Sequence, residues 1–400
     1  MEAGTTAAAY LPDDLVVDIL TRLPARSLCR FKCVSRRWHR LISDPTHRAR
    51  LAQTLSGFFF VSHGPTWRFA GLPSSSVTPP GGDGGPPLVD ATLSFLPTSC
   101  MEREIKILDS CNGLLLLLCS DERPWPPPPP FYVVCNPATR EWVALPQPRH
   151  TPGQDAYCCD CDGNVITGYA AVGFDPAASS LFYVFQIVQV YYDTQPYLVA
   201  VEIYSSETGA WVLSETWWGN GYFGVFTHQM TYFNGSLHLT DDSGAVASVD
   251  SKGSWRITQV LRGEVDEEDN HRHGHRGYIG HSQGRLLYLD DVRGEDVLSI
   301  YVLEDQDCGE WTLKCRVSKK DLLFEPWKKI LRPTYYKAGF HPNGDLIFFY
   351  DRTRERLISY DMSRGDWRVV CTLTDFEHAH RAFFPYVPWY SGGLASPNSN

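Results

Sequence analysis

The sequence contains no long hydrophobic run. Its longest uninterrupted aliphatic segment is Leu114–Leu118, whereas a helix that spans a bilayer needs roughly 20 apolar residues. The first ten residues also lack a basic side chain and an apolar core, so we expect no secretory signal. These absences exclude a transmembrane helix and predict a protein of the cytoplasm, the nucleus or both, without a membrane partner.

Basic residues are in the minority. The chain has 36 Lys and Arg against 46 Asp and Glu, a net charge of −10. Residues 1–51 hold nine of these bases and five of the acids, a net of +4, so the remainder carries −14. This asymmetry predicts two domains of different character. Because affinity for nucleic acid depends on clustered Lys and Arg, we expect no nucleic-acid partner.

The common catalytic and nucleotide-binding strings are absent. Neither G-x-x-x-x-G-K-[ST] nor G-x-S-x-G occurs. Residues 219–224 satisfy G-x-G-x-x-G, but no helix pattern follows them and no βαβ unit surrounds them, so we interpret them as a turn between strands. No Ser/His/Asp or Cys/His set is visible, although a set spread over distant segments would escape this search. We expect no catalytic residue and no cofactor.

Two short clusters contain metal-ligating side chains, Cys158–Cys161 and His271–His275. Structural zinc takes four ligands, usually as spaced pairs from two segments, and neither cluster has a second pair at a fitting distance. We expect no metal site. Two aspartate doublets follow strand-like runs, at Asp241 and at Asp290. They are expected to bond turn amides rather than to act as an acid–base pair.

Cysteine makes up only 12 of the 400 residues. Most cysteines stand singly inside apolar segments, a pattern typical of buried thiols in a reducing compartment. Those expected to be buried are Cys29, Cys33, Cys119, Cys135 and Cys371.

Residues 11–42 carry strong helix signals. A proline and two acids stand at a helix start in Leu11–Asp14, where they complement the helix dipole. Apolar residues then follow at helical spacing as far as Leu23, and Pro24 ends the helix. Ser27 and Ser35 are expected to cap two further short helices. Three short helices bury little surface alone, so this module must pack on a partner or on the rest of the chain.

The segment LPDDLVVDILTRLPARSLCRFKCVSRRWHRLI, residues 11–42, resembles an F-box. The resemblance lies in the Leu-Pro pairs at Leu11 and Leu23 and in Cys-Val-Ser-x-x-Trp from Cys33 to Trp38. It implies an F-box domain over residues 8–52 that binds a Skp1-like adaptor and, through it, a cullin. From periodicity alone, a helical cap on the rest of the chain stays open. By the family pattern, the adaptor-binding residues are Leu11, Pro12, Leu15, Ile19, Leu23, Pro24, Leu28, Val34 and Trp38.

A turn followed by tryptophan recurs five times after residue 55. A strand-like run precedes each turn, and a Gly-containing turn with an apolar strand precedes that run. Each unit therefore supplies about four short strands, which is typical of a propeller blade. The abundance of aromatic residues and glycine also favours a mainly β body. The tryptophans are Trp142, Trp211, Trp255, Trp311 and Trp367.

A sixth, degenerate unit is predicted in residues 57–62, 66–69 and 91–96. The apolar segment Phe383–Tyr390 is expected to add a strand that closes the ring. We predict six blades over residues 56–390, with seven or eight still open. The Pro- and Gly-rich residues 71–87, the Pro-rich residues 124–130 and the acidic, His-rich residues 263–277 are expected to be surface loops.

The segments Ser110–Leu115 and Cys135–Pro146 resemble the F-box-associated, kelch-like propeller domain of plant F-box proteins. Together with the N-terminal module, this resemblance implies a non-enzymatic, substrate-recognition subunit of an SCF-type E3 ubiquitin ligase. Alternatives are a propeller enzyme or sugar-binding protein with a helical cap, and a scaffold that acts outside a ligase. The target protein is not identified. Exposed aromatic candidates for binding it are Trp125, Trp217, Trp218 and Tyr222.

Overall fold

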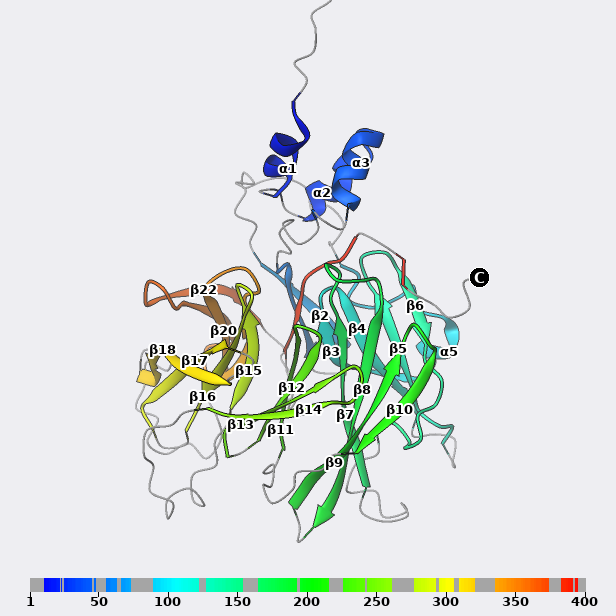
Figure 1. Ribbon diagram of the computed structural model, residues 1–400, viewed down its shortest axis with the longest axis vertical. Helices are drawn as coiled ribbons and strands as arrows, with labels where there is room; N and C mark the ends of the chain where they lie inside the picture. The colour runs from blue at the N-terminus through cyan, green and yellow to red at the C-terminus, as the bar shows by residue number, and fades with distance from the viewer. Residues whose placement is uncertain are drawn as a thin grey trace, which may run out of the picture.

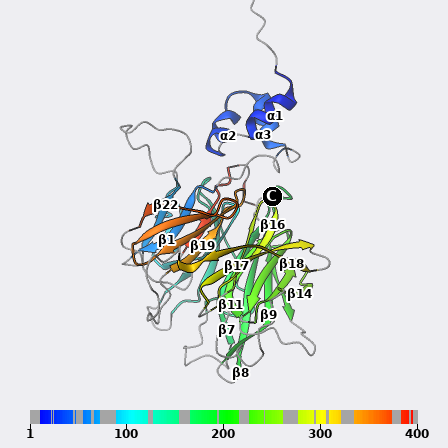
Figure 2. The same ribbon diagram turned by 90° about the vertical axis from the view of Figure 1, so that its left-hand side faces the viewer.

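The structure is a computed structural model of the 400-residue chain. It describes residues 11–21, 23, 25–44, 47, 55–62, 66–72, 89–121, 127–153, 165–192, 195–215, 226–241, 243–260, 277–292, 295–305, 309–320, 335–373, 383–390 and 393–394. In Figures 1 and 2 three helices lie at one end of the molecule, above a large all-β body. Within these residues no helix is long and apolar enough to cross a membrane.

The three N-terminal helices are α1 (Asp13–Thr21), α2 (Ala25–Lys32) and α3 (Arg36–Ser43). Ser35 caps α3 as expected, because its hydroxyl oxygen accepts a hydrogen bond of 3.1 Å from the Trp38 amide. The predicted cap at Ser27 is wrong, since α2 begins two residues earlier at Ala25 and Ser27 lies inside the helix. The helices enclose a small core of Val16, Val17, Leu20, Leu28, Leu41 and Ile42.

The β body is a six-bladed propeller, as predicted (Figure 1). Five blades are four-stranded antiparallel sheets in chain order. Blade 1 contains β3 (Glu104–Cys111), β4 (Leu114–Ser120), β5 (Phe131–Asn136) and β6 (Glu141–Ala144). Blade 2 contains β7 (Val165–Phe174), β8 (Phe182–Tyr192), β9 (Gln195–Ser205) and β10 (Ala210–Glu215). Blade 3 contains β11 (Phe226–Phe233), β12 (Ser236–Asp241), β13 (Ala245–Asp250) and β14 (Trp255–Gln259). Blade 4 contains β15 (Tyr278–Ser282), β16 (Arg285–Asp290), β17 (Val297–Asp305) and β18 (Glu310–Ser318). Blade 5 contains β19 (Tyr335–Phe340), β20 (Leu346–Asp351), β21 (Arg356–Asp361) and β22 (Asp366–Thr372).

Blade 6 closes the ring with strands from both ends of the propeller. Its order is β2 (Thr66–Gly71), β1 (Gly57–Ser62) and β23 (Phe383–Tyr386), so the expected C-terminal closing strand is confirmed. The strand predicted over residues 91–96 is wrong. This segment forms turns, because the Asp90 carboxylate accepts hydrogen bonds from the amides of Thr92 and Ser94, and Leu93 takes a positive φ. A short helix, α5 (Thr98–Met101), follows it.

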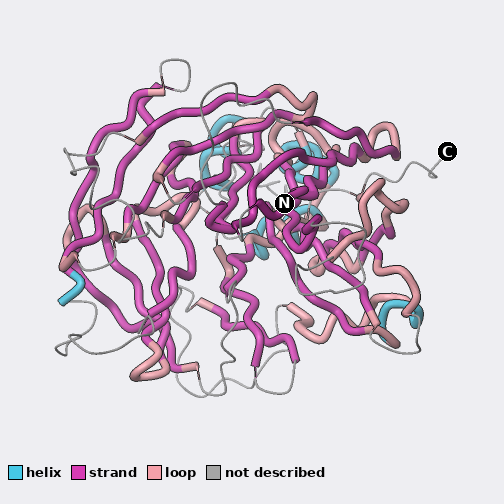
Figure 3. The backbone as a smooth tube through the Cα atoms, turned by 90° about the horizontal axis from the view of Figure 1, so that it is seen from below, coloured by secondary structure: helices cyan, strands magenta, loops and turns pink. Residues whose placement is uncertain are grey.

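The apolar run Leu114–Leu118 is the second strand of blade 1. All five side chains are at most 6% exposed, because each inner strand packs against neighbouring blades on both of its faces. Buried strands need no polar alternation, which explains a run that is too short for a bilayer yet wholly apolar. The first strands of blades 1 to 5 and β23 contact one another in sequence around the centre (Figure 3).

The repeated tryptophans all lie on fourth strands, and three of them join neighbouring blades. Their indole N–H groups donate to the outer edge of the preceding blade: Trp211 to the Pro146 carbonyl (2.7 Å), Trp255 to the Ser214 hydroxyl (3.1 Å) and Trp311 to the Thr258 hydroxyl (3.2 Å). Blades diverge towards the rim, so a large side chain is needed to span the gap. The Trp repeat therefore marks blade-to-blade packing.

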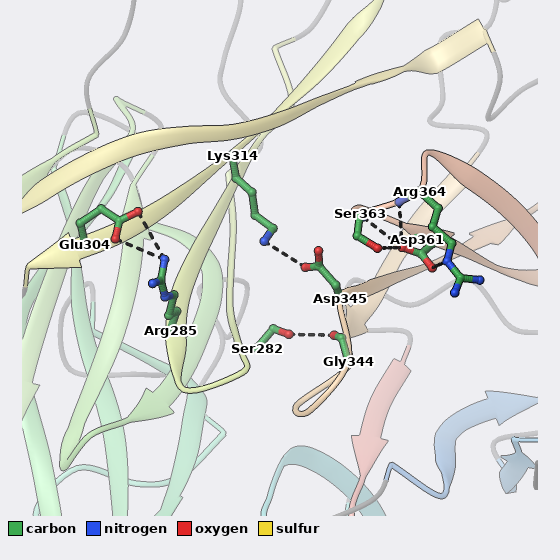
Figure 4. Close-up of polar contacts among 9 residues, drawn as sticks. All are labelled: Ser282, Arg285, Glu304, Lys314, Gly344, Asp345, Asp361, Ser363 and Arg364. Carbon is green, nitrogen blue, oxygen red and sulfur yellow. Dashed lines mark hydrogen bonds and ion pairs between the residues drawn. The ribbon is translucent and has the colours of Figure 1, made fainter.

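Blades 4 and 5 are also joined by polar contacts (Figure 4). The Ser282 hydroxyl donates to the Gly344 carbonyl at 2.8 Å, and Lys314 pairs with Asp345 at 3.0 Å. Two further pairs, Arg285 with Glu304 and Arg364 with Asp361, lie within single blades. These contacts bind one sheet to the next where β15 ends.

The propeller has two unlike faces. Within each four-stranded blade, the turns that join first to second and third to fourth strands lie on one side, which we call the turn face. Of these turns, residues 112–113, 234–235 and 283–284 are among the shortest. On the opposite side, called the connection face, the fourth strand of each blade ends and the first strand of the next blade begins.

The described cysteines are free thiols, and Cys119 and Cys135 are buried as expected. Burial raises the pKa of both thiols well above the ordinary range. Cys371 is only partly buried, and Cys33 is exposed, which contradicts the expectation for that residue. Cys33 lies in the turn between α2 and α3. The side chain of Cys29 lies outside the described residues.

Candidate functional site: an apolar face on the helical module

An exposed apolar stripe lies along α1. Leu11 and Leu15 are 45% and 52% exposed, and Ile19 is 45% exposed. Val34, in the turn before α3, is 62% exposed. The other face of α1 packs inward through Val16, Val17 and Leu20. A nine-residue helix that buries one apolar face and exposes another is typical of a docking element.

An ion pair fixes the start of α1. The guanidinium of Arg37 on α3 lies 2.6 Å from the Asp13 carboxylate through Nε, and its Nη2 donates to the Leu11 carbonyl at 2.5 Å. The charged pair thus holds the N-terminal end of the stripe against α3. From the sequence, Asp13 was expected only to complement the helix dipole, and Arg37 was not a candidate residue. Its partner lies 24 residues away, and no local spacing rule could have found it.

The remaining candidate residues of the module have different positions. Pro12 is exposed at the start of α1. Leu28 is 6% exposed, and Leu23 and Trp38 pack partly buried against the same core. Trp38 meets Phe31 edge to face, with ring centroids 5.1 Å apart. The side chains of Leu23, Leu28 and Trp38 therefore pack beneath the stripe, against the core of the module, and are not part of its exposed surface. Pro24 lies outside the described residues.

Other sequence candidates fall outside the described residues. These are the aromatic residues Trp125, Trp217, Trp218 and Tyr222, the cysteine and histidine clusters at residues 158–161 and 271–275, and the glycine-rich residues 219–224. Within the part of the chain that is described, no group of three or more His, Cys, Asp or Glu side chains is arranged to hold a metal ion.

The expectation that the aspartate doublets bond turn amides is confirmed at Asp241 and wrong at Asp291, whose carboxylate pairs with two lysines. Asp241 accepts hydrogen bonds from the amides of Ser243 and Ala245 at the end of β12. Asp291, on the connection face, pairs with Lys319 at 2.9 Å and Lys337 at 2.8 Å. Burial alone would raise the pKa of Asp291, but the two ammonium groups outweigh it and lower the pKa to about 2. Asp242 lies outside the described residues.

The chain matches the models of two known protein families. The family model "F-box-like" matches residues 8–54, and the model "F-box protein At3g26010-like, beta-propeller" matches residues 89–384. The chain belongs to this F-box β-propeller family. Plant F-box proteins are thus its relatives, as the sequence motifs indicated, and members of the family are typically adaptors rather than enzymes.

Several curated relatives from Arabidopsis thaliana match over most of their length. F-box protein At5g49610 is 27% identical over 91% of this chain and 92% of its own. F-box protein At1g49990 is 29% identical over 86% of this chain and 83% of its own. F-box protein At5g07610 is 25% identical over 81% of this chain and 74% of its own. The similarity therefore spans both the helical module and the propeller.

Proposed function

We propose that this F-box protein is the substrate-recognition subunit of an SCF-type E3 ubiquitin ligase. In this role the helical module binds a Skp1-like adaptor, and through it a cullin, while the propeller binds a target protein. The exposed stripe of Leu11, Leu15 and Ile19 is the observation that carries the proposal, because it leaves large apolar side chains unburied on a small helical domain.

The stripe has the chemistry of an interface anchor. Fully burying an exposed Leu or Ile side chain contributes about 1.5–3 kcal/mol. Because these three side chains are already about half buried, a partner that covers them gains roughly half of that from each, and they serve as anchors within a larger contact. The adjacent Val34 widens the apolar area, and the Arg37–Asp13 pair fixes the orientation of the helix before the partner arrives. A surface that is ordered in advance costs less entropy on binding.

The connection face is the proposed site of target capture. On this face ten to twenty residues of sequence separate the fourth strand of one blade from the first strand of the next, whereas mostly short turns join the strands on the turn face. Long surface segments on a rigid scaffold are where binding residues concentrate. The β8–β9 hairpin, which extends beyond β7 and β10, projects at the end of the molecule opposite the helices (Figure 1).

The proposed mechanism is proximity rather than chemistry. Binding holds a lysine of the target near the ubiquitin-charged enzyme of the assembled ligase, which raises its effective concentration. No side chain of this chain takes part in bond making. No described residue favours the alternatives of a propeller enzyme or a sugar-binding protein.

Adaptor capture tests the proposal directly. The double variant Leu15→Ala, Ile19→Ala should bind a purified Skp1-like adaptor at least about 10-fold more weakly than wild type, because each change removes apolar area from the contact. Val212→Ala is the matched control, since Val212 is 63% exposed on the propeller rim. Isothermal titration calorimetry measures the affinities. Wild-type protein that fails to bind any Skp1-like adaptor, or a double variant that binds as wild type does, refutes the proposal.

A further inference from the structure

Among the described residues, blade 6 has three strands and no fourth. In blades 1 to 5 the third strand is covered on its outer edge by a fourth, antiparallel strand. In blade 6 the third position is occupied by β2, and no described residue pairs with its outer edge. Five of the six blades therefore have four described strands, and blade 6 has three.

The hydrogen-bonding groups on this edge follow from the register. Pro385 stands opposite Phe58 and has no N–H, so within β1 the residues in register to bond β23 are Gly57 and Phe59. Just before β1 the alternation is irregular, because the Ser56 amide donates to the Tyr386 carbonyl at 2.9 Å. The alternate residues of β1 then bond β2, in agreement with the 2.8 Å hydrogen bond from the Leu72 amide to the Ser56 carbonyl. The N–H and C=O groups that point away from β1 therefore belong to Trp67, Phe69 and Gly71.

The last two residues of this edge strand are small. In blades 2 and 5 a third-strand tyrosine packs on the fourth-strand tryptophan, with ring centroids 5.4 Å apart for Tyr204–Trp211 and 4.7 Å apart for Tyr360–Trp367. In blade 6 the third strand instead ends in Ala70 and Gly71. A Cβ added at Gly71 would meet only the Phe69 ring, at 3.9 Å. Small residues therefore stand where the other blades hold a pair of rings.

The chain's own next segment is a poor occupant. Residues 73–88 follow β2 directly and contain Pro73, Pro79, Pro80, Pro86 and Pro87 as well as four glycines. Proline cannot donate to a strand ladder, and glycine weakens a strand. A fourth strand antiparallel to β2 would therefore have to form from the few residues before Pro79.

We propose that the open edge of blade 6 binds an extended segment of the target protein, which adds to β2 as an antiparallel fourth strand. Backbone groups at Trp67, Phe69 and Gly71 give the affinity, and Gly71 places no side chain against the added segment. The edge ends on the turn face, where the chain enters the propeller from the helical module. This inference rests on the proposed function, because it assigns a second contact for the same target.

A matched pair of substitutions tests the strand addition. Gly71→Pro removes the outward N–H of Gly71 and leaves the hydrogen bonds between β1 and β2 intact, whereas Gly71→Ala adds a Cβ and keeps the N–H. The probe is a fluorescein-labelled peptide with the sequence of residues 364–372, the fourth strand of blade 5, carrying Cys371→Ser. Binding is measured by fluorescence anisotropy on the full chain in complex with a Skp1-like adaptor.

Wild type and Gly71→Ala should bind the peptide equally, and Gly71→Pro about fivefold more weakly or worse, because one backbone hydrogen bond is worth about 1 kcal/mol. Hydrogen exchange should show the amides of Phe69 and Gly71 unprotected in the free protein and protected with peptide. The inference is overturned by equal binding to both variants, by no measurable binding to wild type, or by protection in the free protein, which would mean that the chain covers its own edge. Adaptor binding in the same samples separates these outcomes from failure of the proposed function.

Discussion

Asp291 holds a buried negative charge where blades 4 and 5 meet. Besides Lys319 and Lys337, the Tyr335 hydroxyl donates to it at 2.9 Å. Lys319 directly follows the last strand of blade 4, and Lys337 lies in the first strand of blade 5. One carboxylate therefore links two sheets, and both lysines would lose their counter-charge if it were neutral. Removing one partner of a buried ion pair lowers the stability of the fold, because the charge of the other partner stays buried without compensation.

Asp291→Asn should lower the free energy of unfolding at pH 7 by about 3 kcal/mol. The folded-state pKa of Asp291, about 2, lies below its ordinary value of 3.8. The stabilisation is therefore complete above about pH 4 and is lost as the pH falls from 4 to 2. Urea unfolding at pH 7 and pH 3 checks this, and the difference between the variant and wild type should shrink at pH 3. Asp296→Asn removes an exposed pair with Lys320 and should change stability by less than about 1 kcal/mol. Equal stability of Asp291→Asn and wild type at pH 7 would contradict the assignment.

At the scale of the element, α1 has to satisfy two contacts. Leu20 is fully buried in the core of the module, while Leu15, five residues earlier, is 52% exposed. Helical periodicity predicted a single apolar stripe from Leu15 to Leu23. The structure divides the apolar residues between an inner face and an outer face, because Val16 and Val17 take the inward positions. Which of the two faces is inward depends on α3, which packs against α1 and could not be placed from spacing alone.

Leu20→Ala should destabilise the helical module by about 2–5 kcal/mol, because it leaves a cavity in a very small core. Leu15→Ala should leave its stability unchanged within about 0.5 kcal/mol. Hydrogen exchange followed by mass spectrometry over residues 13–43 measures both, with the propeller strands as an internal reference. Equal protection of the helices in the two variants would show that the inner and outer faces are wrongly assigned.

At the scale of the molecule, the C-terminal segment closes the ring through two separate contacts. The strand β23 pairs with β1, and the chain then continues to Trp389, which is 5% exposed and packs on Phe174 of blade 2 with ring centroids 4.7 Å apart. The buried amide of Asn136 donates to the Trp389 carbonyl at 2.9 Å. Gly113 also lies against Trp389. The two motifs most specific to the propeller family, around Asn112-Gly113 and Cys135-Asn136, thus meet at the C-terminal segment.

Gly113→Ala tests the second of these contacts, the one at Trp389. A Cβ there would lie 2.4 Å from the Trp389 Cβ, and φ is +97°. Gly235→Ala is the matched control, because it has φ of +79° in another Asn-Gly turn with nothing within 4 Å. Both changes carry backbone strain of order 1 kcal/mol, and Gly113→Ala should cost about 1–3 kcal/mol more through the clash. Thermal unfolding by circular dichroism gives the comparison. Equal melting temperatures would show that the segment at Trp389 does not secure the ring.

The sequence by itself determined the elements of this protein. Tryptophan after each turn, Asn-Gly turns and apolar strands are local patterns. They were sufficient for a mainly β propeller with five clear blades and for three helices with a cap at Ser35, whereas the count of six blades was predicted with seven or eight left open. The repeated tryptophans could be counted in the sequence, but their role in joining neighbouring blades could not be predicted from it. Trp311 contacts Thr258, a residue 53 positions away.

Only the tertiary structure decided the contacts between distant segments. These are the split of α1 into an inner and an outer face, the pairing of β23 with β1 in place of a strand at residues 91–96, the Asp291 ion pairs, and the open edge of β2. Each depends on which segments meet in space. Hydrophobic periodicity fixes only that a side chain is buried or that a strand pairs, and the choice of partner is set by packing across the whole ring.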